Sequence, residues 1–195
     1  MDGRIAMNIF VLDSDAWISG QMVSDRHSVK MPLETAQMLC TGLIEHGVLN
    51  TPDATKVPYK ATHKNHPSTV WARENREQFE WLGWHGLSLC NTYQQRYGRK
   101  HKCEAVIKEC IKLSYHIPEG DFQLPPQCMG DEYKVEGDTV AAYQNYYLNG
   151  KQYMNKGTGP QWNKGVSAPQ WWTNGLLKKA KLYKTERLSR SLLIQ

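Results

Sequence analysis

Four polar side chains early in the chain follow the spacing of a helix. His27, Lys30, Glu34 and Gln37 recur at intervals of three, four and three residues, so a helix would carry them in one stripe. On an exposed helix the Lys30–Glu34 pair contributes only about 0.3–0.5 kcal/mol. Partial burial would instead shift the pKa of either group, raising that of Glu34 or lowering that of Lys30, and make it useful as an acid, a base or a nucleophile. We therefore treat His27, Lys30 and Glu34 as candidate catalytic residues.

The length of this stripe limits the ligand that it can serve. Gln37 lies about 15 Å from His27 along a helix axis, so one small molecule cannot contact both. A nucleic acid or a nucleotide spans that length. His27 is one turn from Lys30 and could donate to a phosphate, although a histidine at such a position is often a residue satisfied by the fold.

Positive charge gathers in two further segments, "RYGRKHK" at residues 96–102 and "KKAKLYKTERLSR" at residues 178–190. Cations interleaved with aromatic side chains suit a polyanion, because phosphates bind the charges and bases stack on the rings. The alternatives are a solvated surface and favourable contact of the first segment with the negative end of a helix dipole. We interpret the following as candidate DNA-binding residues: Arg26, Gln37, Lys60, His63, Lys64, His66, Arg73, Arg96, Arg99, Lys100, His101 and Lys102.

Several other chemistries find no sequence support. His63 and His66 form an H-x-x-H pair in a loop, but no third ligand is evident, so we expect no metal. Glycine-rich phosphate loops, H-E-x-x-H and G-x-S-x-G are absent. We expect no cofactor.

The elements that must position these residues are mainly helical. Residues 7–13, "MNIFVLD", predict one short strand, and the preceding residues 1–6 resemble a leader or tag, with Met7 as a second possible start. The Asp13–Asp15 cluster can cap a helix that continues to about His46. In its second half an apolar stripe should face the core, comprising Val29, Leu33, Ala36, Cys40 and Leu43. Pro32 should kink or restart this helix.

Further periodic segments complete the expected architecture. A long central helix should end at Gly98, and a Gly-, Pro- and Trp-rich segment, residues 157–172, should lie irregularly over the body through Trp162, Trp171 and Trp172. We predict a mainly α, single-domain helical bundle with one short N-terminal strand and long irregular loops. Its helical domain would cover residues 7–177, followed by a basic tail or helix at residues 178–195. The expected helices after the first span residues 68–97, 103–115 and 139–153.

Composition places the chain among folded proteins. It has 195 residues, a net charge of +5, seven Trp and ten Tyr, which argues against disorder. Five cysteines without a C-x-x-C pair predict free thiols in a reducing compartment. The N-terminus carries no secretory signal and no run of about 18 apolar residues exists, so we expect no membrane partner and a cytoplasmic protein.

Several motifs taken in order resemble a family of uncharacterised proteins encoded by tailed phages. These motifs are "MNIFVLD", "DRHSVKMPLETAQML", "YKATHKNHPSTVWAREN", "YQQRYGRKHK", "AAYQNYY" and a late "PQWW", which together cover most of residues 7–172. The resemblance implies the cytoplasm of an infected bacterial host. It implies no activity.

A remoter resemblance is to pyrimidine-dimer DNA glycosylases of the endonuclease V type, small basic helical enzymes. Asp25, His27 and Glu34 reproduce the spacing of that family's Asp-x-His and catalytic Glu, and the Tyr-rich C-terminal region is similar in kind. The family attacks the sugar with a freed N-terminal amine. Here Asp2 and Asn8 follow the two candidate initiators, and neither favours removal of methionine. If glycosidic chemistry is retained, we expect Lys30 to be the substitute nucleophile, because a lysine desolvated beside a carboxylate can form an imine, with Glu34 handling the protons.

Three hypotheses follow for function. The first is a DNA-binding protein with glycosylase- or lyase-like activity on damaged or modified bases, which would engage the phosphate backbone and an extruded base. A glycosylase without lyase activity is a variant of it. The second is a non-catalytic nucleic-acid-binding or host-takeover protein, and the third is an enzyme acting on free nucleotides.

Overall fold

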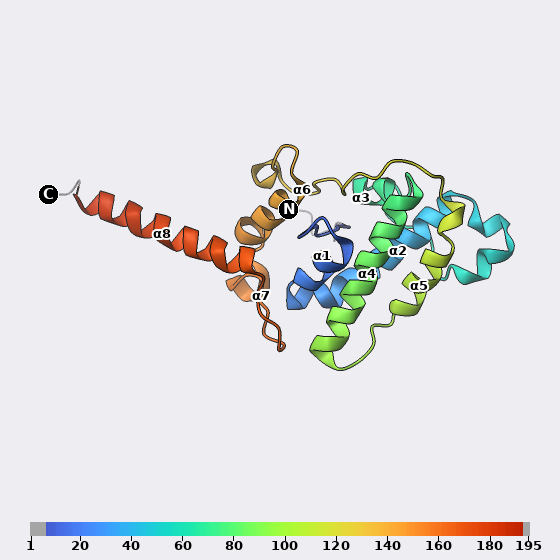
Figure 1. Cartoon of the computed structure of the whole chain (residues 1–195), viewed down its shortest axis with the longest axis horizontal. Helices are drawn as coiled ribbons and strands as arrows, with labels where there is room; N and C mark the ends of the chain where they lie inside the picture. Colours follow the sequence, from blue (N-terminus) through green and yellow to red (C-terminus); the bar gives the residue numbers. More distant parts are fainter. Residues whose placement is uncertain (1–6, 193–195) are drawn as a thin grey trace.

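The computed structural model describes residues 7–192, and these residues form helices joined by long connections without a strand. The mainly helical prediction is therefore confirmed, whereas residues 1–6 and 193–195 lie outside the described part. Figure 1 shows a helical body with one long helix projecting from it. The α-helices are α1 (Ala16–Met22), α2 (Asp25–Glu45), α3 (Pro67–Trp71), α4 (Arg76–Tyr97), α5 (Glu104–Lys112), α6 (Thr139–Asn145), α7 (Met154–Gly157) and α8 (Gln170–Leu192).

Short 3-10 turns and one π-helix fill part of the connections. They are η1 (Val48–Asn50), η2 (Pro52–Lys56), η3 (Ser114–His116), η4 (Asp131–Tyr133) and the π-helical η5 (Tyr146–Gly150). Because η5 follows α6 directly, the helix expected over residues 139–153 changes type at Tyr146. Residues 47–67 are rich in Pro, Thr and Lys, which predicts a long loop. This segment contains η1 and η2, so it is more ordered than its sequence indicates.

The core is built around α4, which packs against α1, α2 and α5 (Figure 1). Glycines permit these close approaches. A Cβ added at Gly86 would lie 2.5 Å from Thr35 Cγ2 on α2, and one added at Gly83 would lie 2.5 Å from Ile111 Cγ1 on α5. The helix surfaces therefore touch through backbone on one side, and α4 is the central helix, as predicted.

Local sequence signals define the ends of α4. The Asn75 side chain accepts a hydrogen bond from Gln78 N at 2.9 Å and so caps the first turn. Gly98 ends the helix in the left-handed conformation, with φ 69°. The expected single helix over residues 68–97 is divided, because the Asn75 cap starts a new helix after α3.

The predicted strand at residues 7–13 is wrong. This segment is buried but pairs with no neighbouring strand, and side chains satisfy its backbone instead. Ser19 Oγ accepts from Leu12 N at 3.0 Å and donates to Phe10 O at 3.2 Å, while Gln144 Nε2 donates to Leu12 O at 3.2 Å. The apolar, β-branched composition reflects burial between helices rather than a sheet.

The first long helix breaks at a different place from the one predicted. It is interrupted at Val23 and Ser24, which separate α1 from α2, and α2 then continues through Pro32 without a restart. Pro32 removes one helical hydrogen bond. Extensive burial along α2 offsets this loss, since most side chains from Met31 to Leu43 are inaccessible.

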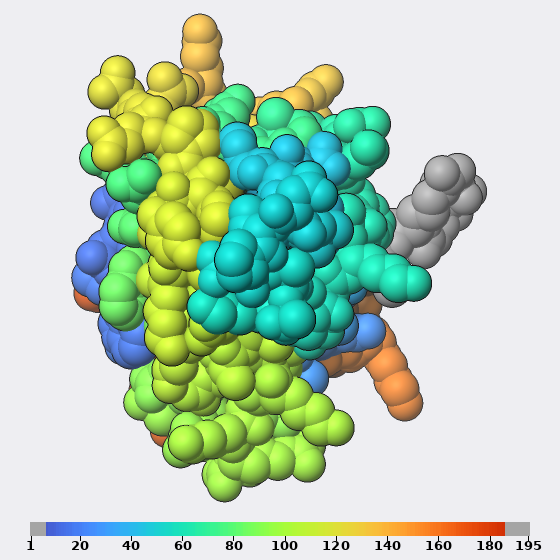
Figure 2. All heavy atoms as spheres, turned by 90° about the vertical axis from the view of Figure 1, so that its right-hand side faces the viewer, coloured from blue at the N-terminus to red at the C-terminus, as the bar shows by residue number. Residues whose placement is uncertain are grey.

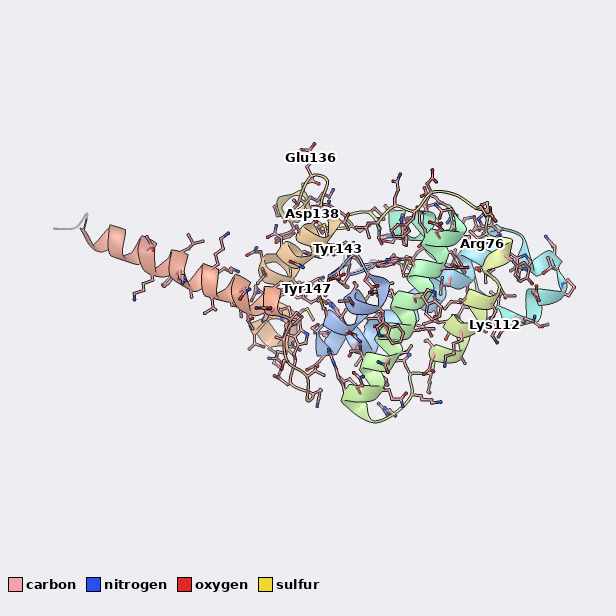
Figure 3. The ribbon with its side chains drawn as sticks, in the orientation of Figure 1. Arg76, Lys112, Glu136, Asp138, Tyr143 and Tyr147 are labelled. Atoms are coloured by element: carbon pink, nitrogen blue, oxygen red, sulfur yellow. The ribbon has the colours of Figure 1, made fainter. Side chains whose placement is uncertain are left out.

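The C-terminal part attaches to the body through aromatic side chains. Figure 3 marks Tyr143 and Tyr147 on α6 and η5, beside the N-terminal segment. Trp162 Nε1 donates to Met22 O at 3.1 Å, so the irregular segment lies over the body as predicted. Trp171 and Trp172 belong instead to the first turn of α8, which extends the expected basic helix toward the N-terminus.

Candidate functional site

A groove of about 530 Å³ lies between α2 and the connection from α4 to α5. Lys30 lines it from α2, and Arg99, Lys100 and Lys102 line it from the connection. No carboxylate is among its lining residues in the described part of the chain. The remaining lining residues are Val29, Leu33, Tyr59, Tyr93, His101 and Cys103. Figure 2 shows the connection, yellow-green at the bottom, below the segment preceding α3, in cyan and teal.

Hydrogen bonds of His101 fix the connection against α2. Cys103 N donates to His101 Nδ1 at 3.2 Å, so the proton resides on Nε2, which donates to Val29 O at 3.1 Å. Burial lowers the pKa of His101, and the bond to Val29 O opposes this shift. The neutral His101 side chain therefore fixes the position of the connection on α2. The three neighbouring cations, Arg99, Lys100 and Lys102, lie on this fixed segment.

The floor of the groove is apolar and aromatic. Val29 and Leu33 are each 43% exposed, although their spacing predicted that both face the core; this prediction is wrong. They lie beside Lys30 and reach the groove because the opposite side of α2 is buried. Arg99 Nε donates to the Tyr93 hydroxyl at 2.8 Å, and its guanidinium lies 5.9 Å from the Tyr93 ring centre.

Lys30 and Glu34 meet at the boundary between this groove and the core. Lys30 Nζ lies 2.7 Å from Glu34 Oε1, and the two side chains are 45% and 5% exposed. The contact is an ion pair without hydrogen-bond geometry, and Oε1 has no hydrogen-bond donor among residues 7–185. Oε2 accepts from Asn8 N at 3.1 Å. The lysine therefore reaches solvent, whereas the carboxylate lies inside and anchors the N-terminal segment.

His27 does not line the groove. It is buried, stacks on the Phe10 ring at 4.0 Å between centres and shares a hydrogen bond with the Tyr147 hydroxyl. Burial, then the nearby charge of Lys151, then that of Lys30, lowers its pKa well below the usual value. His27 is thus a neutral core residue that joins α2 to η5. This agrees with the alternative interpretation, in which the histidine is satisfied by the fold and does not contact a ligand.

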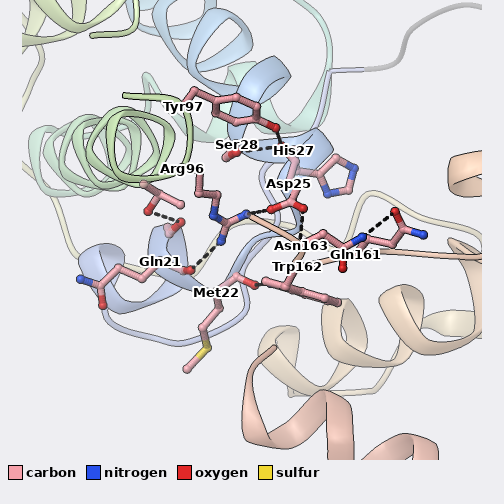
Figure 4. A network of polar contacts seen from close by, with 12 residues as sticks. Gln21, Met22, Asp25, His27, Ser28, Arg96, Tyr97, Gln161, Trp162 and Asn163 are labelled. Atoms are coloured by element: carbon pink, nitrogen blue, oxygen red, sulfur yellow. Dashed lines mark hydrogen bonds and ion pairs between the residues drawn. The ribbon is translucent and has the colours of Figure 1, made fainter. Parts of the chain in front are cut away.

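Arg96 does not line the groove either, so it does not join the cations that follow it in sequence. Its side chain is 1% exposed, and Nη1 donates to Asp25 Oδ1 at 3.1 Å. Asp25 Oδ2 accepts from Asn163 N at 2.7 Å, and Asp25 N donates to Gln161 O at 2.9 Å (Figure 4). Burial lowers the pKa of Arg96 and the Asp25 charge opposes this. The pair joins α4, α2 and the segment before α8.

The residues expected to bind DNA from the long loop lie away from the groove lining. Lys60, His63 and Lys64 are exposed, while His66 Nδ1 accepts from Ser68 N at 3.2 Å and caps α3. Burial and His63 lower the pKa of His66. Arg73 Nη1 donates to the Lys64 carbonyl at 2.5 Å, so these residues stabilise the loop.

The remaining two candidates flank the groove on α2 without lining it. Arg26 is exposed one turn before Lys30, and Gln37 is half-buried one turn after Leu33. Tyr59 and Tyr93 line the groove but were not among the candidates. Nothing in the loop sequence indicates that Tyr59 would approach α2, whereas the position of Tyr93 one turn before Tyr97 could have placed it beside the basic segment.

Comparisons of the chain with protein-family models, curated proteins and solved structures find no match. Among the side chains that the structure describes, in residues 7–185, no three or more His, Cys, Asp or Glu are grouped to hold a metal ion. The helices described within residues 7–192 include none with the length and apolar character that crossing a membrane requires.

Proposed function

We propose that this protein binds DNA through the groove between α2 and the α4–α5 connection. The observation that carries this proposal is the set of three cations, Arg99, Lys100 and Lys102, which line one hollow without an ion-pair partner among residues 7–185. Cations gathered in this way repel one another, and a polyanion relieves that repulsion. Interaction with the α4 dipole alone does not require the cations to surround a hollow.

The lining favours a nucleic acid over a simple inorganic anion. Val29, Leu33 and Tyr59 give the groove an apolar and aromatic surface beside the cations. Nucleotides combine charged phosphates with flat apolar bases, and base stacking on aromatic side chains is worth about 1–3 kcal/mol. This pairing of surfaces also supports the notion that an unpaired or extruded base enters the groove.

The test measures DNA affinity as a function of salt by fluorescence anisotropy with labelled duplex and single-stranded oligonucleotides. Each phosphate contact with duplex DNA contributes about −0.9 to the slope of log K against log salt. Lys100→Ala/Lys102→Ala should therefore lower the magnitude of the slope by about 1.8. The matched control is Lys108→Ala/Lys112→Ala on α5, whose lysines are ion-paired with Glu104 and Glu109 outside this groove.

Two results would overturn the proposal. One is the absence of salt-dependent binding by the unmodified protein, and the other is an equal slope change in groove and control variants. Competition by free mononucleotides as strong as that by oligonucleotides would favour an enzyme of nucleotide metabolism instead.

A second candidate function, abasic-site lyase activity, is favoured by the Lys30–Glu34 pair at the edge of the groove. The deprotonated Lys30 amine would add to the C1′ aldehyde of an abasic sugar, and loss of water would leave an imine. Removal of a C2′ proton would then expel the 3′ phosphate, with Glu34 assisting proton transfer. Glu34 is held in place by its hydrogen bond from Asn8 N. The ion pair must therefore open by movement of Lys30 before this amine can act.

Borohydride trapping tests this activity, because hydride reduces the imine to a stable amine that links protein and DNA. Lys30→Ala should abolish the covalent adduct, and Lys100→Ala should retain it at saturating DNA. No adduct and no strand cleavage across a panel of damaged duplexes would remove the lyase function while leaving DNA binding in place, and the absence of released base from the same panel would remove the glycosylase function.

A further inference from the structure

Three of the five cysteines gather where α2 packs against α5 (Figure 1). Cys40 on α2 and Cys110 on α5 are both fully buried, and their sulfur atoms share a hydrogen bond at 3.7 Å. Cys103 directly precedes α5 and lines the groove around Lys30, with its sulfur 3.6 Å from the Tyr59 hydroxyl. Cys40 and Cys110 are 70 residues apart in the chain, and the fold brings their thiols into contact.

This contact makes the two buried thiols unequal. The hydrogen bond with Cys110 lowers the pKa of Cys40, an effect that burial opposes and the backbone of Tyr59 assists. The same hydrogen bond, and then burial, raises the pKa of Cys110. Cys40 is therefore the sulfur that more readily becomes a thiolate, the form that attacks an oxidant, and Cys110 keeps its proton beside it.

The other two cysteines provide a comparison within the same chain. Cys90 is buried in α4, and burial raises its pKa to about 12. Cys128 is the one cysteine of the five that is only partly buried, and its sulfur lies 3.3 Å from Ser68 Oγ. Neither shares a hydrogen bond with another thiol within residues 7–185. Exposure alone would direct oxidation to Cys128, whereas contact between thiols would direct it to Cys40.

Tyr59 connects the buried pair to the groove. It lines the groove, and its hydroxyl contacts Cys103. The pKa of Tyr59 is raised to about 12, first by this contact, then by burial and then by the negative charge of Cys103, Cys40 and Cys110 as thiolates. All three sulfurs therefore lie near this side chain. Residues 57–66, which include Tyr59, form no helix, and such segments open at a lower free-energy cost than packed helices.

Two thiols in contact can bind a soft metal ion or form a disulfide. A metal site needs further ligands, and no group of three or more His, Cys, Asp or Glu side chains within residues 7–185 could supply them. A disulfide needs only the pair. Its formation requires the two sulfurs to approach from 3.7 Å to about 2.05 Å, which rotation about the side-chain bonds and a small shift of the helices can provide.

We infer that Cys40 and Cys110 are a modification site for hydrogen peroxide and form a disulfide that joins α2 to α5. The Cys40 thiolate attacks one peroxide oxygen, the O–O bond breaks and hydroxide leaves, so Cys40 becomes a sulfenic acid. The Cys110 sulfur then attacks the Cys40 sulfur, the S–O bond breaks, and water leaves with the Cys110 proton. The two thiols together lose two electrons, and one peroxide is reduced to two waters. This inference goes beyond the proposed function and does not depend on DNA binding.

Peptide mapping of the unmodified full chain tests this inference. The folded protein is treated with hydrogen peroxide, unfolded with N-ethylmaleimide to block the remaining thiols, digested and analysed by mass spectrometry. The expected product is a peptide pair linked through Cys40 and Cys110, lighter by two hydrogen atoms than the separate peptides and separated again by dithiothreitol. Oxidation of Cys128 ahead of this link, links between other cysteines, or no oxidation would each overturn the inference.

Two variants test the order of the steps. Cys110→Ser removes the resolving thiol, so Cys40 should remain a sulfenic acid that dimedone traps. Cys90→Ser is the matched control, because it also removes a buried cysteine, and its Cys40–Cys110 link should form at the unmodified rate. No dimedone adduct at Cys40, or an equal loss of the link in both variants, would contradict the assigned roles. Circular dichroism checks that both variants fold, and the mapping of the unmodified chain needs neither.

Urea unfolding shows whether the disulfide forms in the native arrangement. The link closes a loop of 70 residues in the unfolded chain, so oxidation should raise the urea midpoint by on the order of 1 M, and dithiothreitol should reverse the rise. An unchanged or lower midpoint would show that the bond forms only when α2 and α5 are displaced, which would overturn the inference.

Discussion

The buried histidine of α4 should make the stability of this protein depend on pH. His85 is 2% exposed and stacks on Trp81 with 5.3 Å between ring centres. Neither ring nitrogen has a hydrogen-bond partner among residues 7–185, the side chains that the structure describes. Burial lowers the pKa of His85 from 6.5 to about 4; the nearby backbone of Phe10 opposes this, although its geometry falls short of a hydrogen bond.

The sign and size of the effect follow from these two pKa values. Between pH 6.5 and about 4 the unfolded chain binds a proton at His85 and the folded chain does not, so acid favours unfolding. The free energy of unfolding should be unaffected by this group above pH 6.5 and fall progressively below it. The complete loss is about 3 kcal/mol, most of which is lost by pH 4.5.

Urea unfolding followed by tryptophan fluorescence at pH 7.5, 6.5, 5.5 and 4.5 measures this dependence. His85→Leu removes the titrating group and the unpaired nitrogens, so its stability should decline less with acid, by about 2–3 kcal/mol at pH 4.5 relative to the unmodified chain. His27 contributes a loss of the same sign, because its pKa is also lowered, and this loss remains in the variant.

The control is His63→Asn, which removes an exposed imidazole and keeps a residue type that tolerates the local φ of 47°. Its pH profile should keep the full loss that His85 causes, and differ from that of the unmodified chain only through His66, whose pKa His63 lowers. If His85→Leu and the unmodified chain lose stability in parallel between pH 7.5 and 4.5, the reasoning from burial of His85 is refuted.

Two further substitutions test how the body is held together, with urea unfolding as the assay. Arg96→Met should lower the free energy of unfolding by about 3–5 kcal/mol, because it leaves the Asp25 carboxylate partly buried without its cation. Adding Asp25→Asn to this variant should recover part of the loss. If the effects of the two substitutions simply add, the two side chains are not coupled. Gly86→Ala should lower the free energy of unfolding by about 1–3 kcal/mol, because the added Cβ meets Thr35, although alanine has the better helix propensity. A gain in stability would instead show that α2 and α4 can separate freely.

Local sequence signals were sufficient for the class of fold and for several helix ends. Gly98 ends α4 as predicted, since a left-handed residue at that position needs only the local chain. The Asn75 cap acts over a similarly short range, and recognising it would have divided the predicted helix correctly. The strand predicted at residues 7–13 failed because β-branched, apolar composition reports burial, whereas a strand also needs a partner to receive its backbone hydrogen bonds.

The candidate site was predictable only in part. Basic residues 99–102 and the Lys30–Glu34 spacing were evident in the sequence, and the structure brings Lys30 into one groove with Arg99, Lys100 and Lys102. It separates His27 and Arg96 from that groove and buries both. Sequence spacing shows which residues can share a direction on a helix, but not which other elements cover that direction.

The sequence by itself determined that this chain forms helices, where α4 stops and that charge is concentrated after it, because these properties depend on residues close together in the chain. Only the tertiary structure decided that Glu34 points inward while Val29 and Leu33 face the groove. The physical reason is that α2 is covered on most sides by segments distant in sequence, so burial around it is set by packing and not by its own periodicity.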